Sequence, residues 1–150
     1  MSSTDRVEKK KLLRAPRSRV WKALTNAGEF GSWFGMQIDG EFTPGAHLRG
    51  TLTKDLKGMT FDLWIDRVDA EHHFSYRWHP FAIDPKVDYS AEPTTLVEFT
   101  LAEAEGGTLL TVVESGFDAL PPARREAAFP MNARGWEIQV ENVARYLDAT

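Results

Sequence analysis

The 150-residue sequence contains no cysteine, which excludes disulfide bonds, zinc–thiolate sites and a thiol nucleophile. No apolar run approaches the length of a membrane span, and the opening MSSTDRVEKK lacks the apolar core of a signal peptide. The net charge is only −4, and no cluster of lysine and arginine is interleaved with aromatic residues. We therefore expect a cytoplasmic protein that binds neither nucleic acid nor a membrane.

The composition is that of an ordinary globular protein, with 42% hydrophobic and 27% charged residues. A chain of this length builds one hydrophobic core. No repeat, low-complexity tract or linker divides the sequence, so residues 1–150 are expected to form a single domain. Five tryptophans and nine phenylalanines supply large apolar surfaces for the core of that domain.

Patterns typical of β-strands dominate the sequence before its last third. Strands are expected at residues 6–14, 36–42, 46–53, 59–68, 72–79, 95–103 and 108–115. The pair Gly106-Gly107 predicts a hairpin between the last two strands. The segment 80–93 is polar, contains three prolines and is too long for a simple turn, and loops of this kind are often functional or mobile.

Two short helices are expected between the first two strands. Pro16 suits the first turn of one helix, because its missing N–H leaves no helical hydrogen bond unmade there. Asn26 and Gly28 supply the stop signal of this helix. The second helix is expected over residues 29–33 and is closed by Gly35.

The C-terminal third of the sequence changes to a helical period. Apolar residues recur there at steps of three and four, at Phe129, Ala133, Trp136, Val140, Val143 and Leu147. The stripe predicts a helix from about residue 131 to residue 149, roughly 28 Å long at 1.5 Å per residue. Three prolines, Pro121, Pro122 and Pro130, precede this helix or kink its beginning. Because the helix must bury its stripe, we expect it to pack on one face of an antiparallel sheet.

The segment 74–80, FSYRWHP, alternates three aromatic residues with three polar ones. Side chains two positions apart on a strand share a face, so Phe74, Tyr76 and Trp78 point the same way. These rings either fill a core or line a cavity. Trp78 stands at the end of its strand beside a loop, where binding residues tend to occur, and is the strongest candidate for contact with a ligand.

Four blocks of the sequence resemble a known family. They are RAPRSRVWKALTNAGEFGSWFG (14–35), FTPGAHLRG (42–50), GGTLLTVVESGF (106–117) and GWEIQVENVARYL (135–147). They are similar to blocks of the family named for activators of the heat-shock-protein-90 ATPase, within the START-like or SRPBCC superfamily. The resemblance implies an α+β helix-grip fold, in which a curved antiparallel sheet of six to seven strands wraps around the long C-terminal helix.

This superfamily often keeps an apolar cavity between sheet and helix, so the resemblance implies a small apolar or aromatic ligand. The residue pattern gives the following candidate ligand-binding residues: Trp33, Phe34, Phe61, Tyr76, Trp78, Phe99, Glu114, Phe117, Phe129 and Trp136. Three of them, Trp33, Phe34 and Phe117, could guard the mouth of the cavity. The alternative is that these side chains pack at ordinary density. The periodic aliphatic residues Val97, Leu101, Leu110, Val112, Val140, Val143 and Leu147 are expected in the core.

Three polar or mixed positions leave alternatives open. The alternation of its strand points Glu114 inward, where it either orients a ligand or serves as a general base with a raised pKa. Otherwise, near the strand end, it reaches water or a structural partner. His79 precedes Pro80, so its direction is open. Trp64 shares a face with Asp62 and Asp66 and either packs outside or contacts a second copy in a homodimer.

Binding of a small ligand is the leading functional hypothesis. The first alternative is an enzyme of the cyclase, dehydratase or hydrolase kind that the superfamily contains, with Glu114, His79 or Tyr76 moving protons. The second is a protein that modulates a chaperone ATPase, although the chaperone activators carry a further N-terminal domain for which 150 residues leave no room. The family shares no catalytic motif, and none is found in this sequence, so catalytic residues stay unknown, and neither a cofactor nor a metal is expected.

Overall fold

The computed structural model describes residues 5–54, 56–84 and 86–149. Its elements follow in chain order: β1 (Arg6–Leu13), α1 (Arg17–Thr25), α2 (Ala27–Phe34), β2 (Met36–Asp39), β3 (His47–Leu52), β4 (Thr60–Asp69), β5 (His73–Trp78), β6 (Thr95–Ala104), β7 (Gly107–Ser115), a short 3-10 helix (Phe117–Ala119) and α3 (Pro122–Asp148). The expected order of a strand, two short helices, six strands and a long helix is confirmed.

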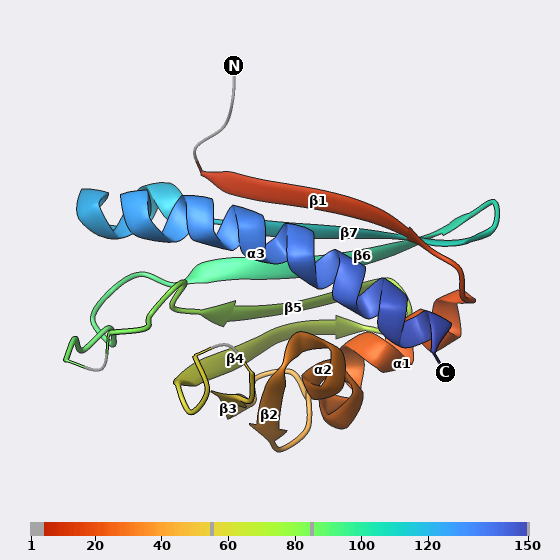
Figure 1. Ribbon diagram of the computed structural model, residues 1–150, viewed down its shortest axis with the longest axis horizontal. Helices are drawn as coiled ribbons and strands as arrows, with labels where there is room; N and C mark the ends of the chain where they lie inside the picture. Colours follow the sequence, from red (N-terminus) through yellow and green to blue (C-terminus); the bar gives the residue numbers. More distant parts are fainter. Residues whose placement is uncertain (1–4, 55, 85, 150) are drawn as a thin grey trace.

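The seven strands form one sheet in the order β1-β7-β6-β5-β4-β3-β2, and every neighbouring pair is antiparallel. The α3 helix lies across one face of this sheet, and α1 and α2, which connect β1 to β2, lie next to the C-terminal part of α3 (Figure 1). This is the helix-grip architecture that the sequence resemblance implies. None of the helices in the described part of the chain has the length and apolarity that a membrane span requires.

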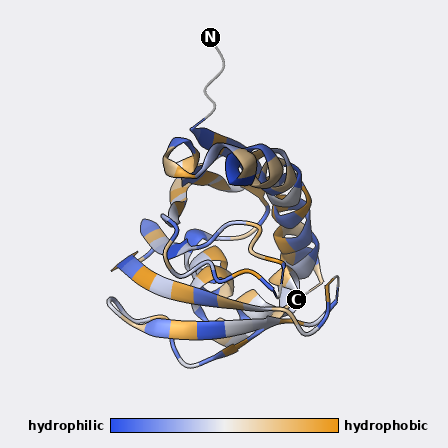
Figure 2. Ribbon diagram, turned by 90° about the vertical axis from the view of Figure 1, so that its left-hand side faces the viewer, coloured by the Kyte–Doolittle hydropathy of each residue, from blue (hydrophilic) through white to orange (hydrophobic). Residues whose placement is uncertain are grey.

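The inner face of the sheet, which α3 covers, carries the core. Polar and apolar residues alternate along the strands and appear as bands of different colour in Figure 2. All seven aliphatic residues expected in the core from their spacing are buried, as are Phe74, Tyr76 and Trp78. The alternation therefore placed the correct side chains inward, because residues i and i+2 of a strand share a face.

The two short helices are separated by a single capping residue, Asn26. Its side chain accepts a hydrogen bond from the backbone N–H of Glu29 at 3.0 Å and so caps α2. Gly35 ends α2 with φ at 88°, a left-handed conformation that favours glycine. Within α2, a Cβ atom on Gly31 would lie 2.1 Å from the carbonyl oxygen of Met36. Glycine at this position therefore lets α2 lie close against β2.

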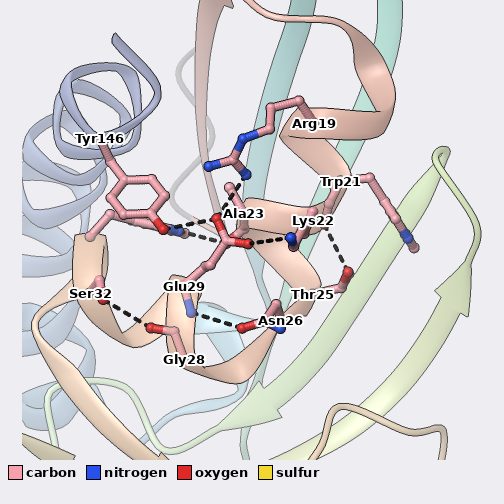
Figure 3. A network of polar contacts seen from close by, with 11 residues as sticks. Arg19, Trp21, Lys22, Ala23, Thr25, Asn26, Gly28, Glu29, Ser32 and Tyr146 are labelled. Carbon is pink, nitrogen blue, oxygen red and sulfur yellow. Dashed lines mark hydrogen bonds and ion pairs between the residues drawn. The ribbon is translucent and has the colours of Figure 1, made fainter. Parts of the chain in front are cut away.

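A polar network around Glu29 joins α1 and α2 to the C-terminal end of α3 (Figure 3). The Glu29 carboxylate accepts hydrogen bonds from Arg19 Nη1 at 2.7 Å and from the Tyr146 hydroxyl at 2.8 Å, and Lys22 Nζ lies 3.8 Å away. Burial by itself raises the pKa of Glu29. The hydrogen bonds from Tyr146 and Arg19 and the charges of Arg19 and Lys22 outweigh burial and hold that pKa below its ordinary value.

The long helix begins earlier than the sequence predicted. It starts at Pro122, which occupies the first turn, and runs through Pro130, so the expected start near residue 131 is wrong. Its 27 residues give a length of about 40 Å. Pro130 removes one helical hydrogen bond, but tertiary packing keeps the first turns of α3 helical. Ala128 is buried, and the rings of Phe117 and Phe129 meet edge to face with 5.2 Å between their centroids.

Candidate functional site

A fully buried carboxylate lies between the sheet and α3. Glu114, on β7, has an exposed fraction of 0%. It pairs across the sheet with Val97 of β6, which in turn pairs with Tyr76 of β5. The alternation expected from the sequence therefore does turn Glu114 inward, near the end of β7 and facing α3.

Four side-chain donors surround this carboxylate. Oε2 accepts hydrogen bonds from Trp78 Nε1 at 2.8 Å and from the Thr95 hydroxyl at 2.5 Å. Oε1 accepts from Trp136 Nε1 at 2.7 Å and from Asn132 Nδ2 at 2.9 Å. The strands β5 and β6 supply two donors and one face of α3 supplies the other two, because residues four apart on a helix lie above one another.

None of the four donors carries a charge. Burial raises the pKa of Glu114, and the hydrogen bonds from Thr95, Trp78, Trp136 and Asn132 oppose this effect without cancelling it. Indole and amide N–H groups can only donate, so the carboxylate oxygens satisfy them best in the ionised form. The result is a carboxylate that is fully hydrogen-bonded and yet easier to protonate than an exposed glutamate.

The Tyr76 hydroxyl is a second buried polar group in this region. It has no hydrogen-bond partner among the residues that the structure describes. Burial, followed by the negative charge of Glu114, raises the pKa of Tyr76 well above its ordinary value. The hydroxyl therefore remains protonated at neutral pH.

Aromatic rings fill most of the space between the sheet and α3. Trp78 and Trp136 lie 6.0 Å apart between ring centroids, and Phe34 lies 6.1 Å from Trp78 and 6.0 Å from Trp136. Phe99 packs edge to face on Trp136 at 5.7 Å. A pocket of about 80 Å³ remains beside these rings, lined by Phe34, Trp78, Asn132, Gly135, Trp136 and Gln139. We call it the inner pocket.

Two amide side chains of α3 form the polar part of the inner pocket. Gln139 Nε2 donates to the backbone oxygen of Phe34 at 2.9 Å, which ties the end of α2 to α3. Asn132 directs its nitrogen at Glu114, since a carboxylate can only accept from an amide. The Asn132 oxygen therefore points elsewhere, and it has no hydrogen-bond partner within residues 5–54, 56–84 and 86–149.

The structure brings together part of the predicted set of ligand-binding residues. Phe34, Trp78 and Trp136 line the inner pocket, and Glu114 lies behind the two indoles. The other six predicted residues, Trp33, Phe61, Tyr76, Phe99, Phe117 and Phe129, are not among the residues that line it.

Two residues expected at the mouth of a cavity are buried instead. Trp33 donates its indole N–H to the backbone oxygen of Ala23 at 2.8 Å. Phe117 is buried beneath Phe129 at the start of α3. Both positions lie at element ends in the sequence, but their rings turn into the core, where they add apolar burial.

Sequence reasoning missed three residues of the inner pocket: Asn132, Gly135 and Gln139. They stand at spacings of three and four on the face of α3 that carries Trp136, and this spacing is the signal that could have found them. Polar residues on a helix are ordinarily assigned to the solvent side, so the apolar stripe alone did not point to them.

His79 does not join Glu114 and Tyr76. Its Nε2 atom lies 3.2 Å from the backbone oxygen of Glu92, and its ring meets Trp64 at 5.5 Å between centroids. Trp64 alternates with the buried residues Leu63 and Ile65, so it and His79 lie on the face of the sheet that α3 leaves uncovered. The expected proton-transfer set of Glu114, His79 and Tyr76 is therefore split between two faces.

The loop between β5 and β6 is attached to the start of α3 by Arg124. Its guanidinium donates to Glu92 Oε1 at 2.8 Å and to the backbone oxygen of Pro80 at 2.6 Å. It also lies over the ring of Tyr89, 4.6 Å from the ring centroid. One side chain of α3 thus contacts the beginning, middle and end of the loop.

The chain matches the sequence model of the family described as "Activator of Hsp90 ATPase homolog 1-like protein" over residues 14–148. No curated protein matches it significantly in sequence. Among solved structures, it is similar to protein MLL2253 from Mesorhizobium loti, with 26% identity and a TM-score of 0.77 over 97% of this chain and 98% of that one.

Two further solved structures are similar. One is DynU16, described as a putative protein in the dynemicin biosynthetic locus, with 28% identity and a TM-score of 0.74; the match covers 96% of this chain and 47% of that one. The other is Ms6760 from Mycobacterium smegmatis, with 22% identity and a TM-score of 0.72 over 98% and 93% of the two chains. At that identity the likeness shows the fold alone.

Proposed function

Because the chain belongs to the family of activator of Hsp90 ATPase homolog 1-like proteins, whose helix-grip fold suits ligand binding, we propose that it binds a small aromatic molecule in the inner pocket. The ligand carries an N–H or O–H group. Catalysis and modulation of a chaperone ATPase, the two other hypotheses from the sequence, stay predictions, since no described residue favours either over binding.

One observation carries this proposal: a pocket walled by three aromatic rings is also lined by Asn132, whose amide oxygen has no hydrogen-bond partner among the described residues. Phe34, Trp78 and Trp136 are the rings, and they offer edges and faces to a planar ligand. The Asn132 oxygen is the acceptor, and Glu114 fixes its direction by holding the amide nitrogen. A ligand donor that meets this oxygen gains a hydrogen bond in an apolar setting, where such bonds are strong.

As it stands, the inner pocket is smaller than the space that one aromatic ring needs, so a side chain of its wall has to move to admit a ligand of one ring. The inner pocket measures about 80 Å³, whereas a cavity of about 150 Å³ is known to enclose benzene. Phe34 is only partly buried and stands at the end of α2. It is therefore the side chain that turns outward to admit a ring, while larger substituents of the ligand remain in water.

Phenol, indole and aniline serve as probes, with toluene as the matched compound that has no donor. We expect each of the three to change the tryptophan fluorescence in a saturable way, and toluene to bind about tenfold more weakly for want of one hydrogen bond. Titrations followed by fluorescence and by calorimetry measure both effects.

Gly135 offers a variant that blocks the pocket without harming the fold. A Cβ atom on Gly135 would meet no atom within 4 Å, and replacing a glycine inside a helix stabilises it by about 1 kcal/mol. Gly135→Leu is therefore expected to stay folded and to lose binding, whereas Gly135→Ala keeps most of the space and most of the affinity. Unchanged fluorescence with all three probes, or full binding by Gly135→Leu, contradicts the proposal.

A further inference from the structure

A larger pocket lies on the opposite face of the sheet from α3. It has a volume of about 360 Å³ and is formed by outward side chains of β3 and β4, by Phe61 of β4 and by the loop that follows β5. Sites for small molecules commonly measure about 300–1,000 Å³, so this pocket is of ordinary size where the inner pocket is small. An adjoining hollow of about 450 Å³ shares Trp64, His79 and Ser90 with it. We call the two together the outer groove.

Trp64 forms the floor of the outer groove. Strand pairing places His47 of β3 opposite Trp64 of β4, and the two rings stack with 4.9 Å between centroids and 16° between planes. His79, which follows β5, meets Trp64 edge to face at 5.5 Å and 85°. A partly exposed indole is thus flanked by two imidazoles that are far apart in the sequence.

The hydrogen bonds of both histidines leave one nitrogen free. His47 Nε2 lies 3.0 Å from Asp62 Oδ1, and His79 Nε2 lies 3.2 Å from the backbone oxygen of Glu92. Both partners can only accept, so in each neutral imidazole Nε2 carries the proton and Nδ1 keeps a lone pair. Neither Nδ1 atom has a hydrogen-bond partner in the part of the chain that the structure describes.

The charge of the outer groove is uneven: Arg77 and Glu92 line the adjoining hollow, whereas the larger pocket is negative. Asp62 and Asp88 line its larger pocket, and none of the described residues that line this pocket is lysine or arginine. Arg49, on the neighbouring strand, lies 3.9 Å from Asp62 but is largely exposed. Asp88 accepts a hydrogen bond from the backbone N–H of Ser90 at 3.0 Å. Hydrogen bonds from Ser90 hold the pKa of Asp88 below its ordinary value, so this carboxylate is ionised at neutral pH.

We propose that the outer groove is a binding site for a small organic cation with several N–H donors, such as an amidinium or a primary ammonium ion attached to a ring. Trp64 offers an aromatic surface that attracts a cation, whereas the ring of Tyr89 already lies under the Arg124 guanidinium, 4.6 Å away. Asp62 and Asp88 supply opposite charge, and the Nδ1 atoms of His47 and His79 accept its N–H groups. A donor-free quaternary ammonium ion makes fewer of these contacts, and a neutral ring makes no charged contact.

Benzamidine is the probe, and benzamide, which has nearly the same shape but no charge, is its control. We expect benzamidine to bind the full-length protein at neutral pH in calorimetry, and its affinity to fall as salt is raised because the carboxylates are near solvent. We expect benzamide to bind at least tenfold more weakly, about the effect of one charge-assisted hydrogen bond. Equal binding of the two compounds, or no binding of benzamidine, overturns the proposal.

Two matched variants locate the site. Asp88→Asn removes one negative charge from the outer groove, and Asp39→Asn removes one from exposed β2, away from both pockets. Asp88→Asn is expected to weaken benzamidine binding about fivefold, the effect of a partly solvated charged contact, and Asp39→Asn to leave it unchanged. Both aspartates are exposed, so both variants are expected to fold, which circular dichroism checks. Equal effects of the two variants on benzamidine affinity contradict the placement of the cation in the outer groove.

Gly135→Leu separates this inference from the proposed function. It fills the inner pocket on the other face of the sheet, so it is expected to abolish phenol binding and to leave benzamidine binding intact. Loss of benzamidine binding in Gly135→Leu places the cation in the inner pocket and overturns the inference.

Discussion

Glu114 and Glu29 both join α3 to another part of the fold, but uncharged donors surround the Glu114 carboxylate and cations surround the Glu29 carboxylate. Glu114 is 0% exposed and accepts only from uncharged donors. The side chain of Glu29 is 16% exposed and faces two cations, Arg19 and Lys22. Burial raises the pKa of both groups, and only at Glu29 do charged and hydroxyl partners reverse the effect.

The difference shows what each network can do. Arg19 and Lys22 are partly or largely exposed and keep water as an alternative partner. The Glu29 network therefore connects the helices, and losing one of its contacts costs little unfolding free energy. Trp78, Thr95 and Trp136 are buried and have no such alternative. Removing Glu114 leaves several donors unsatisfied at once, which makes it the position that fixes the orientation of the inner pocket walls.

The largest expected effect is at the buried network. Trp136→Ala removes a core ring and a donor to Glu114, and it should cost about 3–5 kcal/mol of unfolding free energy. Trp78→Ala should cost less, because its ring borders the pocket and is 8% exposed against 3% for Trp136. Urea denaturation of both variants gives the two values. Equal losses of unfolding free energy in the two variants identify Trp78 as an ordinary core residue. Trp78 would then not differ from Trp136 as a residue at the surface of the inner pocket.

A pH series compares the two carboxylates directly. The pKa of Glu114 is raised above 4.5 in the folded protein, so folding binds a proton. Its contribution to stability is complete below pH 4.5 and is lost as pH rises through the folded pKa. The pKa of Glu29 is lowered below 4.5, so its contribution is present above that pH and is lost as pH falls.

Glu114→Gln and Glu29→Gln each remove one of these dependences. We expect Glu114→Gln to cost about 1–3 kcal/mol, because the amide N–H₂ group replaces an oxygen that accepts from two donors, and to flatten the loss of stability above pH 4.5. Glu29→Gln should cost about 1 kcal/mol of unfolding free energy and should flatten the loss of stability below pH 4.5. Unfolding free energies between about pH 2 and 8 test both signs, and identical slopes in the two variants contradict the comparison.

The smallest effects concern two tyrosine hydroxyls. Tyr146→Phe removes a hydrogen bond to Glu29 and should cost about 0.5–1.5 kcal/mol. The Tyr76 hydroxyl is buried without a partner in the described structure, so Tyr76→Phe should be neutral or stabilise by up to about 1 kcal/mol. Thermal denaturation distinguishes the two results. A clear loss of stability in Tyr76→Phe indicates that this hydroxyl does make a bond.

The fold was predictable because its signals are local. Alternation placed Glu114 inward, and Gly35 marked the end of α2. The start of α3 was not predictable, because Pro130 resembles a helix breaker until the ring contact between Phe117 and Phe129 is known. Contacts of that kind depend on tertiary packing, which overrides local propensity.

The candidate sites were predictable only in part. Trp78 and Trp136 were expected as members of a cavity wall, but Asn132 was not expected as their partner at Glu114. Only two parts of the outer groove could be foreseen, Phe61 as a ligand-binding residue and the loop over residues 80–93 as a functional or mobile segment. Its two histidines and Trp64 meet through the pairing of β3 with β4 and the path of the chain after β5, and one sequence does not specify strand neighbours.

The proline inside α3 has a mechanical consequence. Because Pro130 has no N–H, the carbonyl oxygen of Glu126 lacks its helical donor, and the two parts of α3 are coupled less stiffly there. Arg124, in the first part of α3, is hydrogen-bonded to the loop of the outer groove. Asn132 and Trp136, in the second part, are hydrogen-bonded to Glu114 of the sheet. We therefore expect that α3 bends near Pro130 when the loop moves. The proposed ligands of the inner pocket and of the outer groove would then bind independently of each other.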